Sequence, residues 1–292
     1  MSSAPRVVAA ILTRDRRDLL RQSLDAVLEQ TRPVDRIVVV DNASSDGTGE
    51  MLAADYGGVR VVALAENQGA TGGFHEAIGA ACEEGADWVW LLDDDSIAGP
   101  TALEELLAGI DALGPGEPPA LVCSRVVWTD GNPHLMNRPV VRGRPAEQLA
   151  ETVRRGLLPV RAASWVSVMI ARSAVERSGM PLRHFFYQAD DIEYTARLLR
   201  EARGYLVPGS VVEHRTANLH TAVDDDHRFY YHARNTVLML RGTRAWAARE
   251  KPTLLWFLFV TSVAYLRLNR LRPASVRNLV SALADGLRVE AH

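Results

Sequence analysis

A continuous apolar run near the N-terminus, "RVVAAILT" (6–13), constrains the fold of this chain more than any other feature. An unbroken apolar run, unlike an alternating one, is typical of a β-strand that is buried on both faces of a parallel sheet. The segment that follows, "DRRDLLRQSLDAVLEQ", instead spaces its leucines and its valine as a helix does. Strand followed by amphipathic helix is the repeating unit of a parallel sheet with helices on both faces. We therefore predict an α/β fold with a mostly parallel central sheet.

The alternation continues over the first 130 residues. Further strands are predicted at "DRIVVVDN", "VRVVAL" and "DWVWLLDDD", with helical patterns around residues 48–56 and 72–84. Ligands of such sheets bind at the carboxyl ends of the strands. Polar residues follow each of these strands, namely Asp41 after the second, Glu66 and Asn67 after the third, and Asp93, Asp94 and Asp95 after the fourth. We expect them to converge on one site.

The remainder of the chain is less regular. Residues 114–162 are rich in Pro, Gly and Arg and are predicted to be an irregular connection. Order resumes with "ASWVSVMIARSAVERSG", a strong helix at "DDIEYTARLLREARG" and a short strand that ends in "VVEHR". The last third contains "FYYHARNTVLMLR" and an apolar stretch at 252–266.

Composition narrows the class of protein. Of 292 residues, 47% are hydrophobic and 24% are charged, which is ordinary for a globular protein and argues against disorder. A net charge of -3 argues against nucleic acid as the main partner. Cys82 and Cys123 lie in apolar stretches without a CxxC neighbour, so we expect core thiols in a reducing compartment. The N-terminus has no long apolar region after a basic start, so we expect no signal peptide and a cytoplasmic location.

Three consecutive carboxylates end the fourth strand, at Asp93, Asp94 and Asp95. Carboxylates this close resist ionisation unless a positive charge lies among them. Because side chains alternate along a strand, Asp93 and Asp95 point to the same side. Mg²⁺ and Mn²⁺ take oxygen ligands and leave room for substrate phosphates, so a bound cation would neutralise a diphosphate leaving group. A solvated acidic turn that caps the next helix would explain one aspartate but not three.

Two turns admit both a ligand-binding and a structural interpretation. In "VVVDNASSDGT", Asp41 can accept hydrogen bonds from a ribose or a base, or the segment is an ordinary turn with Asp46 or Thr48 as N-cap. In "ENQGATGGFHEAI", backbone N–H groups can meet an anion at the start of a helix, or the glycines serve a tight turn with positive φ. The second pattern is not GxGxxG, so a dinucleotide fold is poorly supported.

A second acidic group lies in "FFYQADDIEYTARLL", where Asp190, Asp191 and Glu193 open an amphipathic helix behind aromatic residues. Acids in a first helical turn complement the helix dipole, but a carboxylate beside an aromatic wall also suits a general base. His214 ends the strand in "VVEHR". A lone histidine is usually structural, and only its neighbours can make it a metal ligand.

In this order, the segments "VVVDNASSDGT", "ENQGATGGFHEA", "WVWLLDDDS", "FFYQADDIEYTARL", "VVEHR" and "FYYHARNTVLMLR" resemble the family 2 glycosyltransferases of the GT-A fold. The similarity covers roughly residues 6–241 and is strongest to the rhamnosyltransferase and galactofuranosyltransferase branch. It implies a GT-A catalytic domain over 1–241, with a nucleotide-binding half over about 1–130 and an acceptor half over about 131–241. Residues 242–292 would form a helical extension. Residues 124–162 match no motif of the family, so the class of acceptor is predicted but not its identity.

The resemblance also implies roles for individual residues. Donor binding is assigned to Thr13, Asp41, Asn67, Gly69, Gly72, Gly73, Asp93 and Asp94, and metal binding to Asp93, Asp95 and His214. Asp191 matches the catalytic base, with Asp190 and Glu193 orienting the acceptor, whereas Arg234 and Asn235 match a stretch to which we assign no role. The implied reaction is transfer of a sugar, rhamnose or galactofuranose, with inversion. The donor would be UDP- or dTDP-linked, the cofactor Mn²⁺ or Mg²⁺, and the acceptor a glycan or a lipid-linked hydroxyl in cell-envelope or polysaccharide synthesis.

The apolar stretch "PTLLWFLFVTSVAYL" spans 15 residues, fewer than the roughly 20 that cross a bilayer as a helix. Its aromatic residues and the arginines that follow suit a helix lying at a membrane surface, at the inner face of the cell membrane. Packing on the catalytic domain or in the interface of a homo-oligomer explains the stretch equally well.

Two other functions are weighed. A sugar nucleotidyltransferase would need a glycine-rich loop with a basic residue directly after the first strand, and "ILTRDRRDLL" supplies arginines but no glycine. A non-catalytic nucleotide-sugar-binding module would have no reason to keep clustered carboxylates that cost stability.

Overall fold

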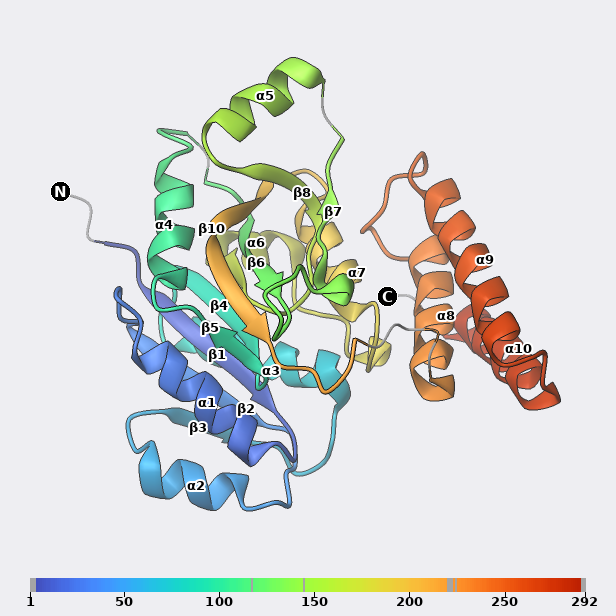
Figure 1. Ribbon diagram of the computed structural model, residues 1–292, viewed down its shortest axis with the longest axis horizontal. Helices are drawn as coiled ribbons and strands as arrows, with labels where there is room; N and C mark the ends of the chain where they lie inside the picture. The colour runs from blue at the N-terminus through green and yellow to red at the C-terminus, as the bar shows by residue number, and fades with distance from the viewer. Residues whose placement is uncertain (1–3, 117, 144, 220–222, 224, 290–292) are drawn as a thin grey trace.

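The computed structural model describes residues 4–116, 118–143, 145–219, 223 and 225–289. One ten-stranded sheet forms its centre, helices cover both faces, and three C-terminal helices lie to one side (Figure 1). The α/β expectation is therefore confirmed. The thiols of Cys82 and Cys123 are both free.

The first four strands are parallel and lie in the order β3-β2-β1-β4. Their bounds are β1 Val7–Thr13, β2 Arg36–Asp41, β3 Arg60–Ala63 and β4 Trp88–Asp93, and the helices between them are α1 Arg17–Leu28, α2 Thr48–Asp55 and α3 Gly69–Glu83. All residues of β1 are buried, as its unbroken apolar run requires. The carboxyl ends of β1, β2 and β4 thus meet at one edge, where the polar residues follow them.

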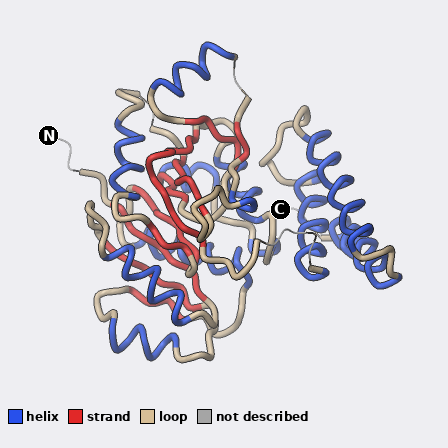
Figure 2. The backbone as a smooth tube through the Cα atoms, viewed as in Figure 1, coloured by secondary structure: helices blue, strands red, loops and turns tan. Residues whose placement is uncertain are grey.

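The second half of the sheet is mixed, in the order β4-β9-β6-β10-β8-β7, with β5 paired to β10. Figure 2 shows the strands gathered at the centre, with helices around them. Its elements are β5 Ser96–Ala98, α4 Ala102–Asp111, β6 Leu121–Val127, η1 Leu135–Asn137, β7 Val140–Val141, α5 Ala146–Arg154, β8 Leu158–Ala162, β9 Val168–Ala171, α6 Arg172–Ser178, η2 Arg183–Phe185, α7 Asp190–Leu198 and β10 Gly204–His214. Strand β9 runs antiparallel to both β4 and β6, and so joins the two halves.

The expectation that residues 114–162 form an irregular connection is wrong. The segment contains β6, which is buried between β9 and β10, together with α5 and β8. Both neighbours of β6 come later in the chain, so no local strand–helix unit marks it. The strand that ends at His214 is likewise longer than expected, because β10 continues through an irregularity between Val207 and Val211 that contains Pro208 and Gly209.

The C-terminal helices α8 Asp226–Arg241, α9 Lys251–Leu268 and α10 Pro273–Arg288 pack on one another. The rings of Phe229 on α8 and Tyr265 on α9 stack with their centroids 3.7 Å apart. Arg161 on β8 joins these helices to the sheet, since its guanidinium bonds Glu250 Oε1 at 2.8 Å and lies over the Trp246 ring. The domain boundary between residues 241 and 242 remains a prediction.

Candidate active site

A cavity of about 540 Å³ opens at the carboxyl ends of β1, β2 and β4. The loop before α7, the first residues of α7 and the start of α8 close its other sides. Its polar and aromatic lining is Thr13, Arg14, Arg16, Asn42, Asn67, Asp93, Asp94, Asp95, Asn137, Trp165, Phe186, Tyr187, Gln188, Asp190, Asp191, His214, Thr216, His227 and Arg228. Of the strand-end residues that were expected to converge, Asp41 and Glu66 do not line the cavity. The others do, namely Asn67, Asp93, Asp94 and Asp95.

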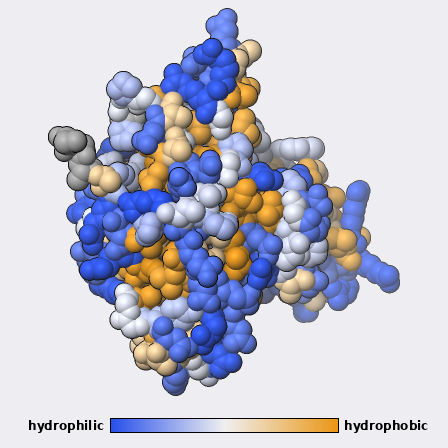
Figure 3. Space-filling view, turned by 60° about the vertical axis from the view of Figure 1, so that its left-hand side comes forward, coloured by the Kyte–Doolittle hydropathy of each residue, from blue (hydrophilic) through white to orange (hydrophobic). Residues whose placement is uncertain are grey.

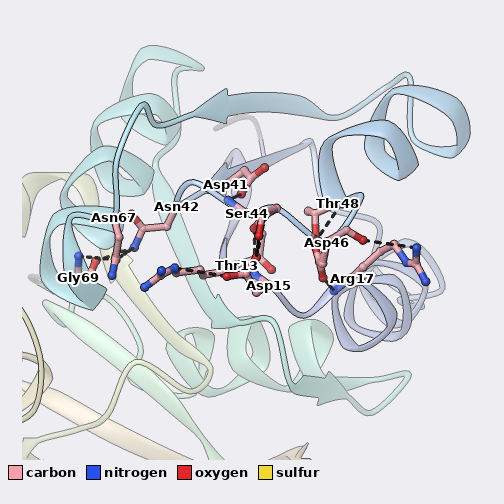
Figure 4. Close-up of polar contacts among 12 residues, drawn as sticks. Thr13, Asp15, Arg17, Asp41, Asn42, Ser44, Asp46, Thr48, Asn67 and Gly69 are labelled. Carbon is pink, nitrogen blue, oxygen red and sulfur yellow. Dashed lines mark hydrogen bonds and ion pairs between the residues drawn. The ribbon is translucent and has the colours of Figure 1, made fainter. Parts of the chain in front are cut away.

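One wall is an amide network at the ends of β2 and β3 (Figure 4). The Asn42 Nδ2 group donates to Asn67 Oδ1 at 3.1 Å and to the Gly69 carbonyl at 3.0 Å. Asp41 is buried, accepts a hydrogen bond from the Ser44 N–H at 2.9 Å, and is not among the lining residues. Its neighbour Asn42, for which no role was expected from the sequence, lines the cavity instead. The next turn is closed by Asp46, whose Oδ1 accepts from the Thr48 hydroxyl at 2.6 Å.

The glycines of the α3 turn serve backbone shape and packing. Gly69 has φ +71°, and a Cβ at this position would collide with the Phe186 carbonyl. At Gly73, a Cβ would collide with the Leu12 side chain. At Gly72, a Cβ would collide with the Gln68 side chain. Of the three glycines, Gly69 alone lines the cavity. Contact of Gly72 or Gly73 with the sugar donor therefore stays a prediction.

The acidic cluster lies opposite a histidine from a distant part of the chain. Asp93 ends β4 and Asp95 lies two residues beyond it, whereas His214 ends β10, where it pairs in register with Ser96 of β5. One ligand atom from each of Asp93, Asp95 and His214 lies within 4.8 Å of the others. Pairing of β5 with β10 thus brings the lone histidine to the acids.

Arg16, which was not expected in the site, lies beside these carboxylates. Its Nη1 is 2.6 Å from Asp95 Oδ2 and 3.2 Å from Asp94 Oδ1. When all three carboxylates are ionised, they and the guanidinium together carry two negative charges, which a divalent cation would neutralise. The available signal was that "TRDRR" follows β1 at the same sheet edge as the acids.

Burial and mutual repulsion set the ionisation of the cluster. Burial raises the pKa of Asp93 well above its usual range, and the charges of Asp95 and Asp94 raise it further. Burial also raises the pKa of Asp94 to about 6, although the Arg16 charge opposes the shift. For Asp95, burial is outweighed by the contact with His214 and the charge of Arg16, so its pKa is lowered. Asp95 therefore carries the most stable negative charge of the three.

The His214 ring is held by a second residue that the sequence analysis missed. Asn137 Oδ1 lies 2.8 Å from His214 Nδ1, and Asn137 Nδ2 donates to Ser164 Oγ at 3.0 Å. This contact orients the ring so that His214 Nε2 faces Asp95 Oδ1, 3.0 Å away. Within the described chain, Asp95 Oδ1 is buried without a well-directed hydrogen bond. A histidine nitrogen and a carboxylate oxygen in these positions can both bind one cation.

The acids of α7 occupy three different environments. Asp191 lines the cavity, where burial, followed by the charge of Asp190, raises its pKa to about 8. Asp190 Oδ2 accepts a hydrogen bond from Trp165 Nε1 at 2.9 Å. Glu193 is buried, pairs with Arg197 at 3.0 Å, and is not among the lining residues. Only the first two acids can therefore meet a ligand in this arrangement.

The loop before α7 is strained and is held by α8. Phe186, Gln188 and Ala189 all have φ near +60°, which non-glycine residues rarely adopt. Asn235 Nδ2 donates to the carbonyls of Phe185, Tyr187 and Gln188, at 3.0, 2.8 and 2.7 Å. Arg234 Nη2 also donates to the Phe185 carbonyl, at 3.0 Å. The "FYYHARN" segment thus shapes the aromatic wall of the cavity, a role that local sequence did not reveal.

Comparison with known proteins shows the family to which this fold and site belong. The family model described as "Glycosyl transferase family 2" matches residues 9–176, more than half of the chain. The chain is 31% identical over 279 residues to galactofuranosyltransferase GlfT1 of Mycobacterium tuberculosis (strain ATCC 25618 / H37Rv), which covers 87% of this chain and 89% of that protein. It is 30% identical over 282 residues to galactofuranosyltransferase GlfT1 of Mycolicibacterium smegmatis, with coverage of 87% and 90%.

A solved structure supports the same fold. S. aureus TarS 1-349 in complex with UDP-GlcNAc matches 97% of this chain and 81% of its own, with a TM-score of 0.65 and 16% identity. The fold and site define a GT-A glycosyltransferase, as predicted. The chain belongs to glycosyltransferase family 2. Neither a nucleotidyltransferase nor a non-catalytic binding module has comparable support.

Proposed function

We propose that this chain transfers galactofuranose from a UDP-linked donor to a hydroxyl of a glycan or lipid-linked acceptor, with inversion and with a divalent cation. The proposal rests on one observation, that Asp93, Asp95 and His214 offer ligand atoms within 4.8 Å in a cavity that Asp191 also lines. The name of the mycobacterial relatives supports the sugar, and the UDP-GlcNAc complex of TarS supports the nucleotide.

Asp191 is proposed as the general base. A carboxylate whose pKa is raised to about 8 holds a proton more readily than an ordinary one, so it is well suited to remove the proton from an acceptor hydroxyl. The hydroxyl oxygen then attacks the anomeric carbon from the side away from the departing diphosphate, and the configuration inverts. Asp190, which is fixed by the Trp165 indole, would orient the acceptor.

Asp93, Asp95 and His214 would hold the cation, either Mn²⁺ or Mg²⁺. When bound, such an ion supplies positive charge to a leaving diphosphate. Arg16 adds a positive charge of its own, and its half-exposed guanidinium can reach an anion in the cavity. Thr13 and Asn67 would contact the donor, while Asp41 would need to turn from Ser44 to meet a ribose or base.

Binding of nucleotides by calorimetry is the first test. UDP, dTDP and GDP are titrated with Mn²⁺ and again with a chelator, and transfer is then assayed with UDP-galactofuranose and dTDP-rhamnose. We expect UDP to bind only with Mn²⁺, and galactofuranose to be transferred. Preferential binding of dTDP together with rhamnosyl transfer would show that the donor is dTDP-rhamnose. Nucleotide binding that the chelator leaves unchanged would contradict the proposed cation.

Asp191→Asn separates binding from chemistry. The substitution keeps size and hydrogen bonding but removes the base, so we expect turnover to fall about 10²- to 10⁴-fold while UDP binding is unchanged. Product stereochemistry from the wild-type enzyme, read by NMR, checks inversion. An Asp191→Asn enzyme with unchanged turnover would remove this residue from the mechanism.

A further inference from the structure

Helix α9 carries apolar side chains on two opposite sides. Leu258 and Tyr265 on one face are buried against α8 and α10. The opposite face carries Leu255, Trp256, Phe259 and Val260, at the i, i+1, i+4 and i+5 positions that share one side of a helix. A helix that is apolar all round is normally buried all round, so the second face calls for an occupant outside the described chain.

The outer face is exposed to an unusual degree for such large side chains. Trp256 is 65% exposed, Leu255 58% and Phe259 57%. The rings of Trp256 and Phe259 lie side by side, with centroids 5.5 Å apart. Figure 1 shows α9 on the side of α8 away from the sheet, and Figure 3 shows apolar side chains among hydrophilic ones over these C-terminal helices. A continuous exposed apolar surface of this kind marks an interaction site.

The charge of the C-terminal helices indicates what kind of surface binds the outer face of α9. Residues 251–292 carry Lys251 and five arginines against Asp285 and Glu290, a net charge of +4, whereas the whole chain carries -3. Residues 1–250 therefore carry -7. Arg267, Arg270 and Arg272 are all exposed where α9 ends. The apolar face thus ends in a basic cluster on an otherwise acidic protein.

We propose that this face of α9 docks on a lipid bilayer with anionic headgroups, the aromatic side chains entering the interface and the arginines meeting the headgroups. Trp and Arg at the edge of an apolar stripe are suited to such an interface, because each has an apolar body and a polar end. In the described part of the chain, no helix is long and apolar enough to cross a membrane, so α9 would lie on the surface. A second copy of the chain in a twofold pair would instead bring two basic clusters together.

The docking surface and the cavity are connected through α8. Helix α8 packs on α9 and α10, and its first turn places His227 and Arg228 in the cavity lining. Docking would therefore bring the active site close to the bilayer, where the lipid-linked acceptor of the proposed function would lie. Bilayer binding needs neither donor nor cation, so its outcome is independent of the proposed reaction.

Co-sedimentation of the full chain with vesicles tests the proposal. The vesicles are phosphatidylcholine alone, or phosphatidylcholine with roughly one third phosphatidylglycerol, at about 0.1 M and about 0.5 M salt. We expect binding to the anionic vesicles at low salt, and at least about tenfold weaker binding for Trp256→Ala/Phe259→Ala and for Arg267→Gln/Arg270→Gln. Matched controls are Leu28→Ala/Val61→Ala and Arg36→Gln/Arg154→Gln, which change exposed residues elsewhere.

Three results would overturn the proposal. The first is no binding to anionic vesicles at low salt. The second is equal weakening by the control variants, which would indicate a non-specific charge effect. The third is a dimer in light scattering that Trp256→Ala/Phe259→Ala converts to a monomer, which would make the face an interface between copies. Thermal unfolding of each variant confirms that a loss of binding is not a loss of folding.

Discussion

Asp191 lies in a setting that opposes its own ionisation, because burial and the charge of Asp190 raise its pKa to about 8. In the unfolded chain an aspartate ionises near its ordinary value of about 3.9. Between these two values, the folded protein binds a proton that the unfolded chain does not. Stability contributed by this residue is therefore complete below about pH 4 and is lost as the pH rises through about 8.

Asp191→Asn should consequently stabilise the protein at pH 8 and have little effect at pH 4. We expect the free energy of unfolding to rise by about 2 kcal/mol at pH 8, less than the full pKa shift allows because the carboxylate is partly exposed to the cavity. Urea unfolding at both pH values measures this, with exposed Asp111→Asn as control. An equal effect at both pH values would show that the asparagine acts by packing and not by charge.

The same pKa affects the rate. Because the base must be deprotonated, kcat/KM should increase with pH above the ordinary carboxylate range, and this limb should disappear in Asp191→Asn. A profile that is already flat at pH 5 would mean that the carboxylate ionises normally in the working enzyme.

Asn137 should matter to cation binding without touching the cation. It holds His214 Nδ1 and so directs Nε2 toward Asp95. We expect Asn137→Ala to weaken Mn²⁺ binding about 10- to 100-fold by calorimetry, with folding retained. The matched control is Asn132→Ala, an exposed asparagine of the same segment whose side chain bonds Asp130. Equal affinities in the two variants would leave Asn137 a purely structural residue.

At the scale of elements, α8 holds the loop that forms the aromatic wall. The single amide of Asn235 donates to three backbone carbonyls of the loop, one of which it shares with Arg234. The same loop has three non-glycine residues with positive φ. A loop in a strained conformation persists only when its surroundings enforce it. The interaction between α8 and residues 185–189 is thus what positions the start of α7, and with it Asp190 and Asp191.

We expect Asn235→Ala to lower the free energy of unfolding by about 2 kcal/mol, because buried carbonyls lose their donor, and to lower turnover as well. The control is Asn278→Ala on α10, which also bonds a backbone carbonyl, that of Asp226, but lies outside the cavity. It should lose stability and keep turnover. Denaturant unfolding and a transfer assay on the same samples compare the two, and loss of turnover in both would mean that general destabilisation is responsible.

At the scale of the whole molecule, the sheet and the C-terminal helices are joined by Arg161. It is buried, bonds Glu250, and donates to the Ala196 carbonyl at 2.6 Å. Arg161→Met should cost about 3 kcal/mol, because Glu250 and buried carbonyls lose their partner. Arg172→Met, which breaks an exposed pair with Glu176, should cost less than about 1 kcal/mol. Similar losses measured by denaturant unfolding would show that the Arg161 contact does not hold the two parts together.

The parts of the fold that could be predicted are those with local signals. Strands β1 to β4 and their helices follow from apolar period and spacing, and a parallel order of this kind places Asp93 and Asp95 at the ligand-binding edge. Strand β6 could not be recognised as a central strand because its partners β9 and β10 come later in the chain. The exposure of the outer face of α9 could not be predicted either, since an apolar stretch has the same sequence pattern whether it is buried or exposed.

The sequence by itself determined that carboxylates, an amide and a histidine lie at or near the ends of strands, because the apolar pattern of these strands can be recognised. Tertiary structure alone decided which of them meet. Pairing of β5 with β10 carries His214 to Asp95, and η1 carries Asn137 to His214. Asp41 turns to Ser44 while Asn42 faces the cavity, and Arg16 lies among the acids. Such contacts join residues distant in the chain, and their energies depend on burial and on the charges nearby, neither of which is encoded in local spacing.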